Sequence, residues 1–288
     1  MLTAALRGIT GAVSRMPLPR ALALGRCLGA VFGSVVRYHR ADALDALGRA
    51  FPEKNPDELA GIVRRMYRNL GMNLIETLRL VGGATEGLDE RVTPVGIDIV
   101  HAALARGRGA LALTAHLGSW DLLTYKSVRL GLPLTVITKD VKNRALNDFW
   151  MEGRRRFGLN LVPARNSYRT CLRALSRGGI IGFVLDQNVI RKEGVFVDFF
   201  GRPACTTAGL AFMAAHSQAP VFPGFLRRTA DDRHEMRIHP LLEPPPDREP
   251  ETIRQATQQY TKIVEDAVRA YPDQWTWIHR RWRTQPAE

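Results

Sequence analysis

The sequence predicts an α/β fold with a mainly parallel central sheet flanked by helices, preceded by a helical N-terminal segment. From about Gly96, short apolar runs alternate with helical patterns, which is typical of a parallel sheet with helices on its faces. The 288 residues are 45% hydrophobic and 24% charged, an ordinary globular composition with enough length for a sizeable core. We therefore expect residues 1–40 to form a basic amphipathic segment and residues 41–288 to form a single α/β domain.

The N-terminal segment is basic and apolar. The first 41 residues contain six arginines and no Asp or Glu, and Arg26 and three glycines interrupt the apolar stretch 21–36. A spanning helix needs roughly 20 mostly apolar residues, and a central arginine opposes spanning. A cleaved signal peptide fits poorly, because basic residues continue past the apolar stretch. The pattern favours a segment that lies on an anionic leaflet, and a soluble helix packed on its own domain is the alternative.

The next element is a helix with a clear start. Asn55 can cap it, Pro56 suits the first helical position, and Glu58 completes a capping box. Apolar residues then recur every four positions, at Ile62, Met66, Leu70, Leu74 and Leu78. This stripe predicts a helix that packs against the core.

The alternating region supplies the remaining elements. Helical patterns cover 97–105, 120–130, 144–157, 168–176, 206–216 and 251–270. Strand-like runs cover 110–114, 134–138, 160–162, 180–185 and 221–226, with shorter ones at 195–199 and 236–238.

The charge of the chain limits its partners. Lys and Arg number 41 against 28 Asp and Glu, a net charge of +13. Such a balance indicates nucleic acid, an anionic membrane surface, or phosphorylated substrates and carriers. The three cysteines form no CxxC pair and the histidines have no metal-ligand spacing, so we expect no metal site and no disulfide scaffold.

The most informative stretch is ALALTAHLGSWD, residues 110–121. A buried strand leads into a turn that carries His116, at the end of the strand where a parallel sheet binds its ligands. Gly118 permits a tight turn, and Asp121 lies in the first turn of the following helix. A carboxylate beside the imidazole would make His116 a general base for a hydroxyl group. The alternative is a loop histidine and an aspartate that only favours the helix dipole.

With these motifs in view, the sequence resembles the bacterial lipid A biosynthesis (lauroyl/myristoyl) acyltransferases, members of the lysophospholipid acyltransferase superfamily. The resemblance extends from about residue 40 to 286. Four blocks carry it: TAHLGSWDLL at 114–123, FWMEGRRRFG at 149–158, the segment 185–211, and YPDQWTWIHRRWRTQP at 271–286. It implies a fold like that of the glycerolipid acyltransferases.

The resemblance implies an enzyme at the cytoplasmic face of the inner membrane, in contact with its anionic lipids. The donor would be acyl-ACP or acyl-CoA and the acceptor a hydroxyl of a glycolipid, without a metal or redox cofactor. His116 would be the general base and Asp121 its orienting carboxylate, while Arg154 would bind an anionic group of acceptor or donor. The remaining implied site residues, which would line the pocket, are Asp186, Gln187 and Arg202. The helix 62–78 would form one wall of a groove for the acyl chain.

Several alternatives stay open. Many lipid A enzymes of this family have Glu where this chain has Asp121, and the Asp form also resembles the phosphatidylinositol mannoside acyltransferases. A lysophospholipid or an amino-acid lipid is another possible acceptor. From different classes, a basic nucleic-acid-binding protein would explain the charge and the Arg- and Trp-rich C-terminus, and a non-catalytic lipid-binding relative would bind glycolipid without turnover. We expect no nucleic-acid partner, because that alternative leaves the turn with His116 unexplained.

Overall fold

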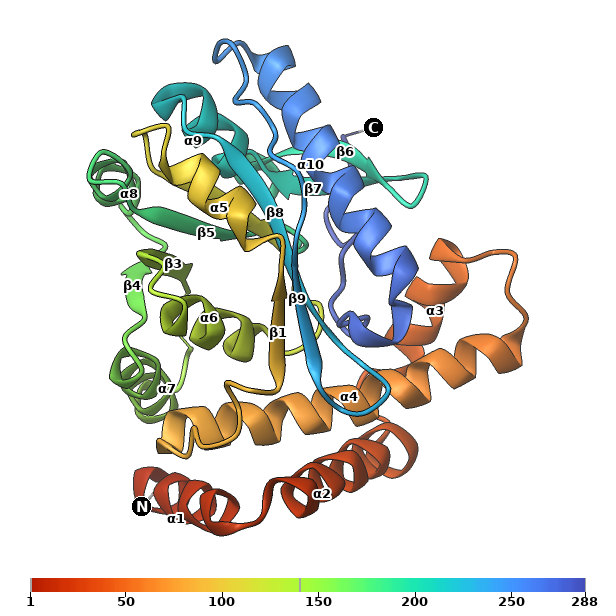
Figure 1. Cartoon of the computed structure of the whole chain (residues 1–288). Coiled ribbons are helices and arrows are strands. Elements are labelled where there is room, and N and C mark those ends of the chain that lie inside the picture. The colour runs from red at the N-terminus through yellow and green to blue at the C-terminus, as the bar shows by residue number, and fades with distance from the viewer. Residues whose placement is uncertain (1, 140, 288) are drawn as a thin grey trace.

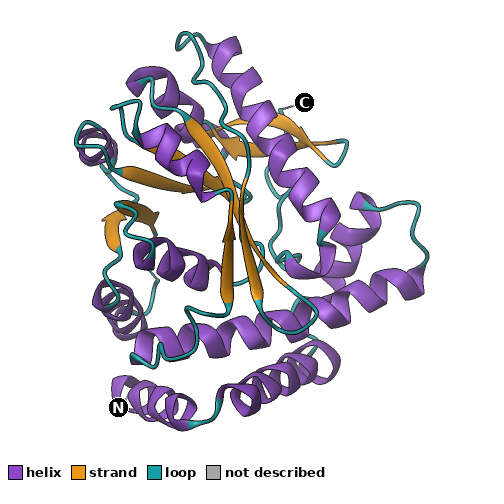
Figure 2. Ribbon diagram, viewed as in Figure 1, coloured by secondary structure: helices purple, strands orange, loops and turns teal. Residues whose placement is uncertain are grey.

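The computed structural model describes residues 2–139 and 141–287, and it contains a seven-stranded central sheet (Figures 1 and 2). Its strands are β1 (Val92–Val95), β2 (Ala110–Thr114), β3 (Leu134–Thr138), β4 (Asn160–Pro163), β5 (Ile180–Val184), β8 (Val221–Arg228) and β9 (His234–Ile238). The strand order is β1-β9-β8-β2-β5-β3-β4, and only the β8–β9 pair is antiparallel. The predicted fold class is therefore confirmed.

Helices cover both faces and one end of this sheet. They are α1 (Leu2–Arg15), α2 (Leu18–Val31), α3 (Arg40–Ala50), α4 (Pro56–Gly82), α5 (Ile97–Leu104), α6 (Trp120–Arg129), α7 (Arg144–Arg156), α8 (Tyr168–Leu175), α9 (Gly209–Ser217) and α10 (Pro250–Ala270). A π-helical turn, Phe32–Val36, extends α2, and 3-10 turns occur at Arg191–Glu193 and Pro272–Gln274. The predicted start of α4 is confirmed, because the side chains of Asn55 and Glu58 form the reciprocal capping box.

Two stretches depart from the sequence-based expectation. β6 (Gly194–Phe199) and β7 (Arg202–Thr207) form a separate antiparallel hairpin. The helix expected to start at residue 206 therefore begins only at Gly209, because Thr206 and Thr207 pair with β6. The short strand β1 was also not predicted, since its four residues include Pro94 and show little apolar alternation.

The core lies on both faces of the sheet. In β2, Leu111 and Leu113 point into a cluster shared with α3, α4, α8, α9 and α10. Ala110 and Ala112 point to the opposite face, where residues of α5 and α6 pack. This alternation is the period-2 pattern of a strand buried on both sides.

The N-terminal helices lie along α4 at one end of the molecule (Figure 1). The backbones of α2 and α4 are in close contact, because a Cβ at Gly29 would lie 2.0 Å from the Tyr67 carbonyl oxygen. A Cβ at Gly71 would likewise lie 2.0 Å from the Gly25 carbonyl oxygen. By length and composition alone, the run Leu18–Val36 could cross a membrane.

Candidate active site

The strand register brings His116 and Asp186 together. Thr114 at the end of β2 is opposite Val184 at the end of β5. His116 lies two residues after Thr114 and Asp186 two residues after Val184, so the two side chains leave the sheet at the same level. His116 Nδ1 is 2.9 Å from Asp186 Oδ1, and the His116 backbone N–H donates to Asp186 Oδ2 at 3.0 Å. Asp186 therefore fixes both the ring and the backbone of the histidine.

The expected role of Asp121 is different in the structure. Its Oδ1 accepts a hydrogen bond from Arg154 Nε at 2.7 Å, and its Oδ2 accepts one from Thr77 Oγ1 at 3.1 Å. The carboxylate in contact with the imidazole is that of Asp186, which the sequence indicated only as a lining residue. Asp121 lies in the first turn of α6 and is directed toward α4 and α7, so its effect on His116 is through charge.

Asp186 is buried and accepts a third hydrogen bond, from Trp275 Nε1 at 2.7 Å to Oδ2. Burial alone would raise its pKa, but the adjacent His116 and these hydrogen bonds lower the pKa to about 2. Burial likewise opposes the charged form of His116, yet the carboxylate of Asp186 outweighs burial and raises the pKa of the imidazole. In the neutral imidazole, Nδ1–H donates to Asp186, which leaves Nε2 free to accept a proton.

The turn after His116 is held from several sides. Asn73 Nδ2 donates to the Gly118 carbonyl at 2.8 Å, and the Gly118 N–H donates to the Gln274 carbonyl at 2.9 Å. Gly118 has φ +64°, and a Cβ there would lie 2.0 Å from the Leu226 carbonyl oxygen. Only glycine combines this φ with such a close approach. The turn is therefore a rigid support for the histidine.

A buried polar cluster lies behind this turn. Glu76 Oε2 accepts from Arg228 at 2.7 Å, its Oε1 is 2.8 Å from His234 Nε2, and Arg228 also donates to Asn73 at 2.9 Å. Burial would raise the pKa of Glu76, but the charges of His234 and Arg228 lower it to about 2. Sequence reasoning did not find this support. The available signal was a row of polar residues, Asn73, Glu76 and Thr77, within a helix that is otherwise apolar.

Arg154 is the residue of its arginine triplet that faces the site. Its side chain is largely buried and lines the same cavity as His116, whereas Arg155 and Arg156 are exposed. Gly153 makes this possible, since a Cβ there would lie 2.4 Å from Val81 Cβ and would push α7 away from α4. The charge of Arg154 therefore lies beside Asp121 at the cavity wall.

The other two expected lining residues have different positions. Gln187 lines the cavity, and its Nε2 is 3.4 Å from His116 Nε2. Arg202 begins β7 in the hairpin and is not among the cavity-lining residues that the structure describes. The arginine that contacts the Gln187 backbone is Arg281, which is fully buried and donates to the Cys205 carbonyl at 2.9 Å. Arg202 belongs to the segment 185–211 that carries part of the resemblance, but this membership does not place its side chain at the cavity.

The C-terminal segment belongs to the site rather than to an exposed tail. Trp275, Trp277 and Arg281 are fully buried. Thr276 Oγ1 donates to the His116 carbonyl at 3.3 Å, and His279 Nε2 accepts the Asn188 N–H at 2.9 Å. The tryptophans Trp275 and Trp277 and Arg281 are thus used for packing behind the turn that carries His116, whereas Arg280 and Arg283 are exposed.

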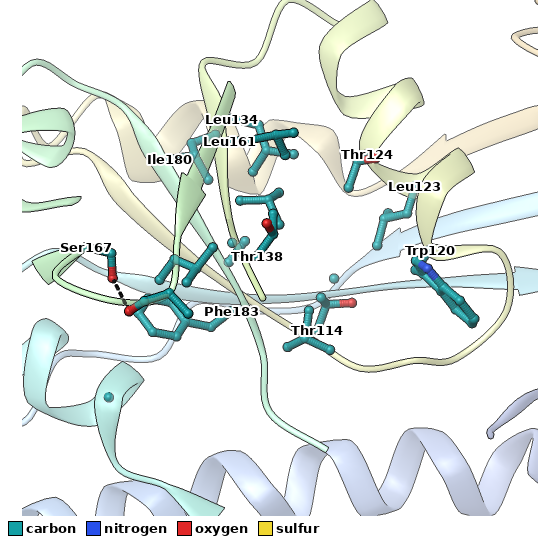
Figure 3. A pocket seen from close by; sticks show the side chains of 18 of the residues that line it. Thr114, Trp120, Leu123, Thr124, Leu134, Thr138, Leu161, Ser167, Ile180 and Phe183 are labelled. Carbon is teal, nitrogen blue, oxygen red and sulfur yellow. Dashed lines mark hydrogen bonds between the residues drawn. The ribbon is translucent and has the colours of Figure 1, made fainter. Parts of the chain in front are cut away.

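His116 opens into a cavity of about 810 Å³, a volume in the range of ligand pockets. Its walls come from every strand of the central sheet except β1, from Thr207 of β7, and from α6, α7, α8 and α9. Figure 3 shows Leu134, Leu161 and Ile180 gathered at one end and Thr114 and Trp120 at the other. Most of the surface is apolar, so the cavity suits a long hydrocarbon chain.

Small residues on the strands create this space. Ala112 and Gly182 face each other across β2 and β5, and Gly224 on β8 also lines the cavity. The expectation that the helix 62–78 walls the groove is wrong, because none of the described lining residues lies on α4. Met66 belongs to the core beneath the opposite face of the sheet.

Within residues 2–139 and 141–287, no group of three or more His, Cys, Asp or Glu side chains could hold a metal ion.

The fold and the family match together define an α/β acyltransferase, in which a His–Asp pair lies beside a largely apolar cavity. The chain belongs to the bacterial lipid A biosynthesis acyltransferase family, whose model matches residues 2–284.

The chain is also similar to individual proteins. The lipid A biosynthesis palmitoleoyltransferase of Escherichia coli K12 is 28% identical over 279 residues, which cover 94% of this chain and 88% of that protein. The phosphatidylinositol mannoside acyltransferase of Mycolicibacterium smegmatis is 26% identical over 278 residues, covering 92% and 86%. The crystal structure of the 1-acyl-sn-glycerophosphate acyltransferase PlsC from Thermotoga maritima aligns with TM-score 0.41 and 15% identity over 86% of this chain and 97% of that one.

Proposed function

We propose that the protein transfers a fatty acyl chain from an acyl thioester to a hydroxyl group of a lipid A precursor. The observation that carries the proposal is the His116–Asp186 pair, whose histidine lines the apolar cavity. Relatives in Escherichia coli and Haemophilus influenzae are lipid A biosynthesis acyltransferases that align over at least 90% of this chain.

The proposed reaction begins with His116. Its Nε2 takes the proton of the acceptor hydroxyl, and the oxygen attacks the thioester carbonyl. The raised pKa of His116 favours the imidazolium that forms, and the ionised Asp186 stabilises it. When the tetrahedral intermediate collapses, the C–S bond breaks and Nε2–H returns the proton to the leaving thiolate. The products are an ester and a free thiol, so the reaction needs no oxidant, reductant or metal.

Two cavity-lining polar groups have roles in this proposal. The Gln187 amide lies against the imidazole at 3.4 Å, where it can donate to the developing oxyanion. Arg154 carries its charge at the cavity wall and is held by Asp121 through Nε, so its remaining N–H groups can bind a phosphate of the acceptor. The role of Asp121 is then to position Arg154.

A mannosylated phosphoinositide is the second candidate acceptor. The alignment with the mycobacterial enzyme, at 26% identity, favours it nearly as much as the lipid A relatives favour theirs. Both acceptors are anionic glycolipids, which the net charge of +13 and Arg154 suit equally.

We also propose that α1 and α2 rest on the cytoplasmic face of the inner membrane without crossing it. α2 and its π-helical extension expose a set of apolar side chains: Leu24, Leu28, Val31, Phe32, Val35 and Val36. The opposite face of α2 is in backbone contact with α4, and the same N-terminal segment carries four exposed arginines, Arg7, Arg15, Arg20 and Arg37. Phe32→Asp with Val35→Asp should abolish flotation with anionic vesicles, whereas Val141→Asp, at an exposed apolar position outside α1 and α2, should not.

Lipid mass spectrometry of the host tests the function. A strain without the gene should lack one acyl chain on one glycolipid, and the wild-type gene should restore it, whereas His116→Ala should not. The mass difference identifies the acceptor and the chain. Full rescue by a His116→Ala protein present at wild-type level would refute the catalytic assignment.

A further inference from the structure

Trp120 is a large aromatic side chain that the fold does not use in its core. It is the first residue of α6 and is only partly buried. Among the described residues, the hydrophobic clusters do not include it. The indoles of Trp275, Trp277 and Trp282 donate hydrogen bonds to other residues, whereas the Trp120 indole N–H contacts no acceptor in the part of the chain that the structure describes. Packing of the fold therefore does not account for this side chain.

The periodicity of α6 directs Trp120 into the cavity. Trp120, Leu123, Thr124 and Ser127 have the i, i+3, i+4, i+7 spacing of one helix face, and all four line the cavity. Figure 3 shows Trp120, Leu123 and Thr124 together on this side of the cavity. The next residue, Asp121, lies about 100° further around the helix and contacts α4 and α7 instead. The cavity-facing side of α6 therefore begins with an aromatic ring.

The indole lies against the imidazole of His116. The two ring centroids are 5.2 Å apart and the ring planes cross at 74°. In the proposed reaction the acceptor hydroxyl lies at His116 Nε2, so the carbon atoms that bear this hydroxyl lie beside the imidazole too. Trp120 and Gln187 both contact the imidazole and line the cavity. Of these two side chains, Trp120 presents the broad apolar face.

The opposite end of the cavity suits the acyl chain. Three apolar side chains gather at that end in Figure 3: Leu134, Leu161 and Ile180. With the chain of the thioester there, the acceptor reaches His116 from the end that carries Trp120. Arg154, the proposed phosphate ligand, is held by Asp121, the residue next to Trp120. A ring on Trp120 and a phosphate on Arg154 can therefore belong to one acceptor molecule.

We propose that the Trp120 indole binds the pyranose ring that carries the reacting hydroxyl, and so orients this hydroxyl toward His116 Nε2. The proposal rests on the proposed function and assigns a residue that selects a sugar over a glycerol backbone. A pyranose ring has C–H groups on its faces and hydroxyl groups around its rim, so it packs flat on an aromatic face. A glycerol backbone has no comparable flat face. The lipid A precursor and the mannosylated phosphoinositide both carry pyranose rings.

Binding of sugars that lack acyl chains tests the assignment independently of turnover. The probes are the deacylated headgroup of lipid A, a phosphorylated glucosamine disaccharide, and methyl α-mannoside. Each is mixed with the full-length protein in detergent for saturation-transfer NMR. In the wild type we expect the strongest transfer to the C–H protons on one face of a ring, and the sugar with the stronger transfer identifies the acceptor class.

Substitutions at Trp120 should change this signal in a graded way. Trp120→Leu should weaken binding about fivefold, the loss of one aromatic contact, while Trp120→Phe keeps an aromatic face and should retain most of the transfer. A Trp120→Phe protein as weak as Trp120→Leu would overturn the proposal. Displacement of the disaccharide by an equal concentration of glycerol 3-phosphate would also overturn it, because the site would then recognise phosphate alone.

Steady-state kinetics with the glycolipid provide a second readout. Trp120→Leu should raise the KM for the acceptor about fivefold, leave the KM for the acyl thioester unchanged, and leave the acid limb of the pH profile in place. A shifted acid limb with an unchanged acceptor KM would overturn the proposal, since Trp120 would then only position His116. The control is Trp282→Leu, a partly buried indole that packs against the core, which should lower the melting temperature without changing the acceptor KM.

Two results separate this inference from the proposed function. If the wild type acylates a glycolipid and Trp120→Leu does so with the same acceptor KM, the inference fails and the function stands. If the sugars bind through Trp120 but the wild type transfers no acyl chain to any glycolipid, the proposed function fails while the sugar site stands.

Discussion

Asp186→Asn is the substitution whose consequence the structure defines most sharply. Asp186 accepts two hydrogen bonds at Oδ2, from the His116 backbone and Trp275, and one at Oδ1, from the His116 ring. An asparagine has one carbonyl oxygen and one NH₂ group. The oxygen can satisfy two donors at the Oδ2 position, so the NH₂ group must face His116 Nδ1.

This arrangement reverses the tautomer of the histidine. An NH₂ group facing Nδ1 requires Nδ1 to accept, which places the proton on Nε2, where the acceptor hydroxyl must be deprotonated. Replacing the carboxylate behind a catalytic histidine costs roughly 10⁴-fold in kcat, about 5.5 kcal/mol of transition-state stabilisation. Since Asp186 raises the pKa of His116, the acid limb of the residual activity should also move to lower pH.

The assay is the pH dependence of kcat/KM with a fixed acyl thioester and glycolipid acceptor. Asp121→Asn is the matched control, because Asp121 contacts Arg154 and not the imidazole. It should raise the KM for the acceptor and shift the acid limb less. Activity of a folded Asp186→Asn protein within tenfold of wild type, with an unchanged acid limb, would refute the assigned role of this carboxylate.

Three other predictions follow from the same structure. Trp275→Phe removes a hydrogen-bond donor to the buried Asp186 carboxylate, so it should lower the free energy of unfolding by about 1.5–3 kcal/mol and also reduce kcat. The Trp277 indole donates to a backbone carbonyl instead, so Trp277→Phe should affect stability alone, and equal losses of kcat in the two variants would contradict this. The pKa of Glu76 is lowered to about 2, so its contribution to stability is complete above about pH 4.5 and is lost as the pH falls toward 2. Melting temperatures measured between pH 4.5 and 2 should therefore decline steadily, and a plateau over this range would contradict the prediction. Gly182→Val should fill cavity space and favour shorter acyl chains, and an unchanged chain-length distribution in the products would exclude the cavity as the chain site.

Much of the fold was predictable because the strands are short apolar runs between clear helical patterns. β2 and β3 have the predicted boundaries, and the capping residues correctly mark the start of α4. His116 was identifiable because a strand followed by His and Gly has few structural explanations. These signals are all local, within about ten residues.

The partner of His116 was not predictable in the same way. Asp121 is near in the sequence, but Asp186 is near in space because β5 is the neighbour of β2 and their ends are in register. Strand order and register depend on the packing of the whole sheet, which one sequence does not reveal. The same limit applies to Trp275 and Arg281, which looked like parts of a basic tail and are buried at the site.

Contacts on the two sides of α4 connect the N-terminal helix α2 to the turn that carries His116. One side is in backbone contact with α2 through Gly29 and Gly71, and the other donates from Asn73 and Thr77 to the turn and helix that follow His116. A helix with its side chains is about 10–12 Å across. In the proposed placement of α1 and α2 on a leaflet, the height of His116 above the lipid surface would be set by stacked helices rather than by a flexible linker. The enzyme would then select its acceptor partly by this height, because the reacting hydroxyl would have to stand that far out of the bilayer, as a sugar headgroup does and a glycerol backbone does not.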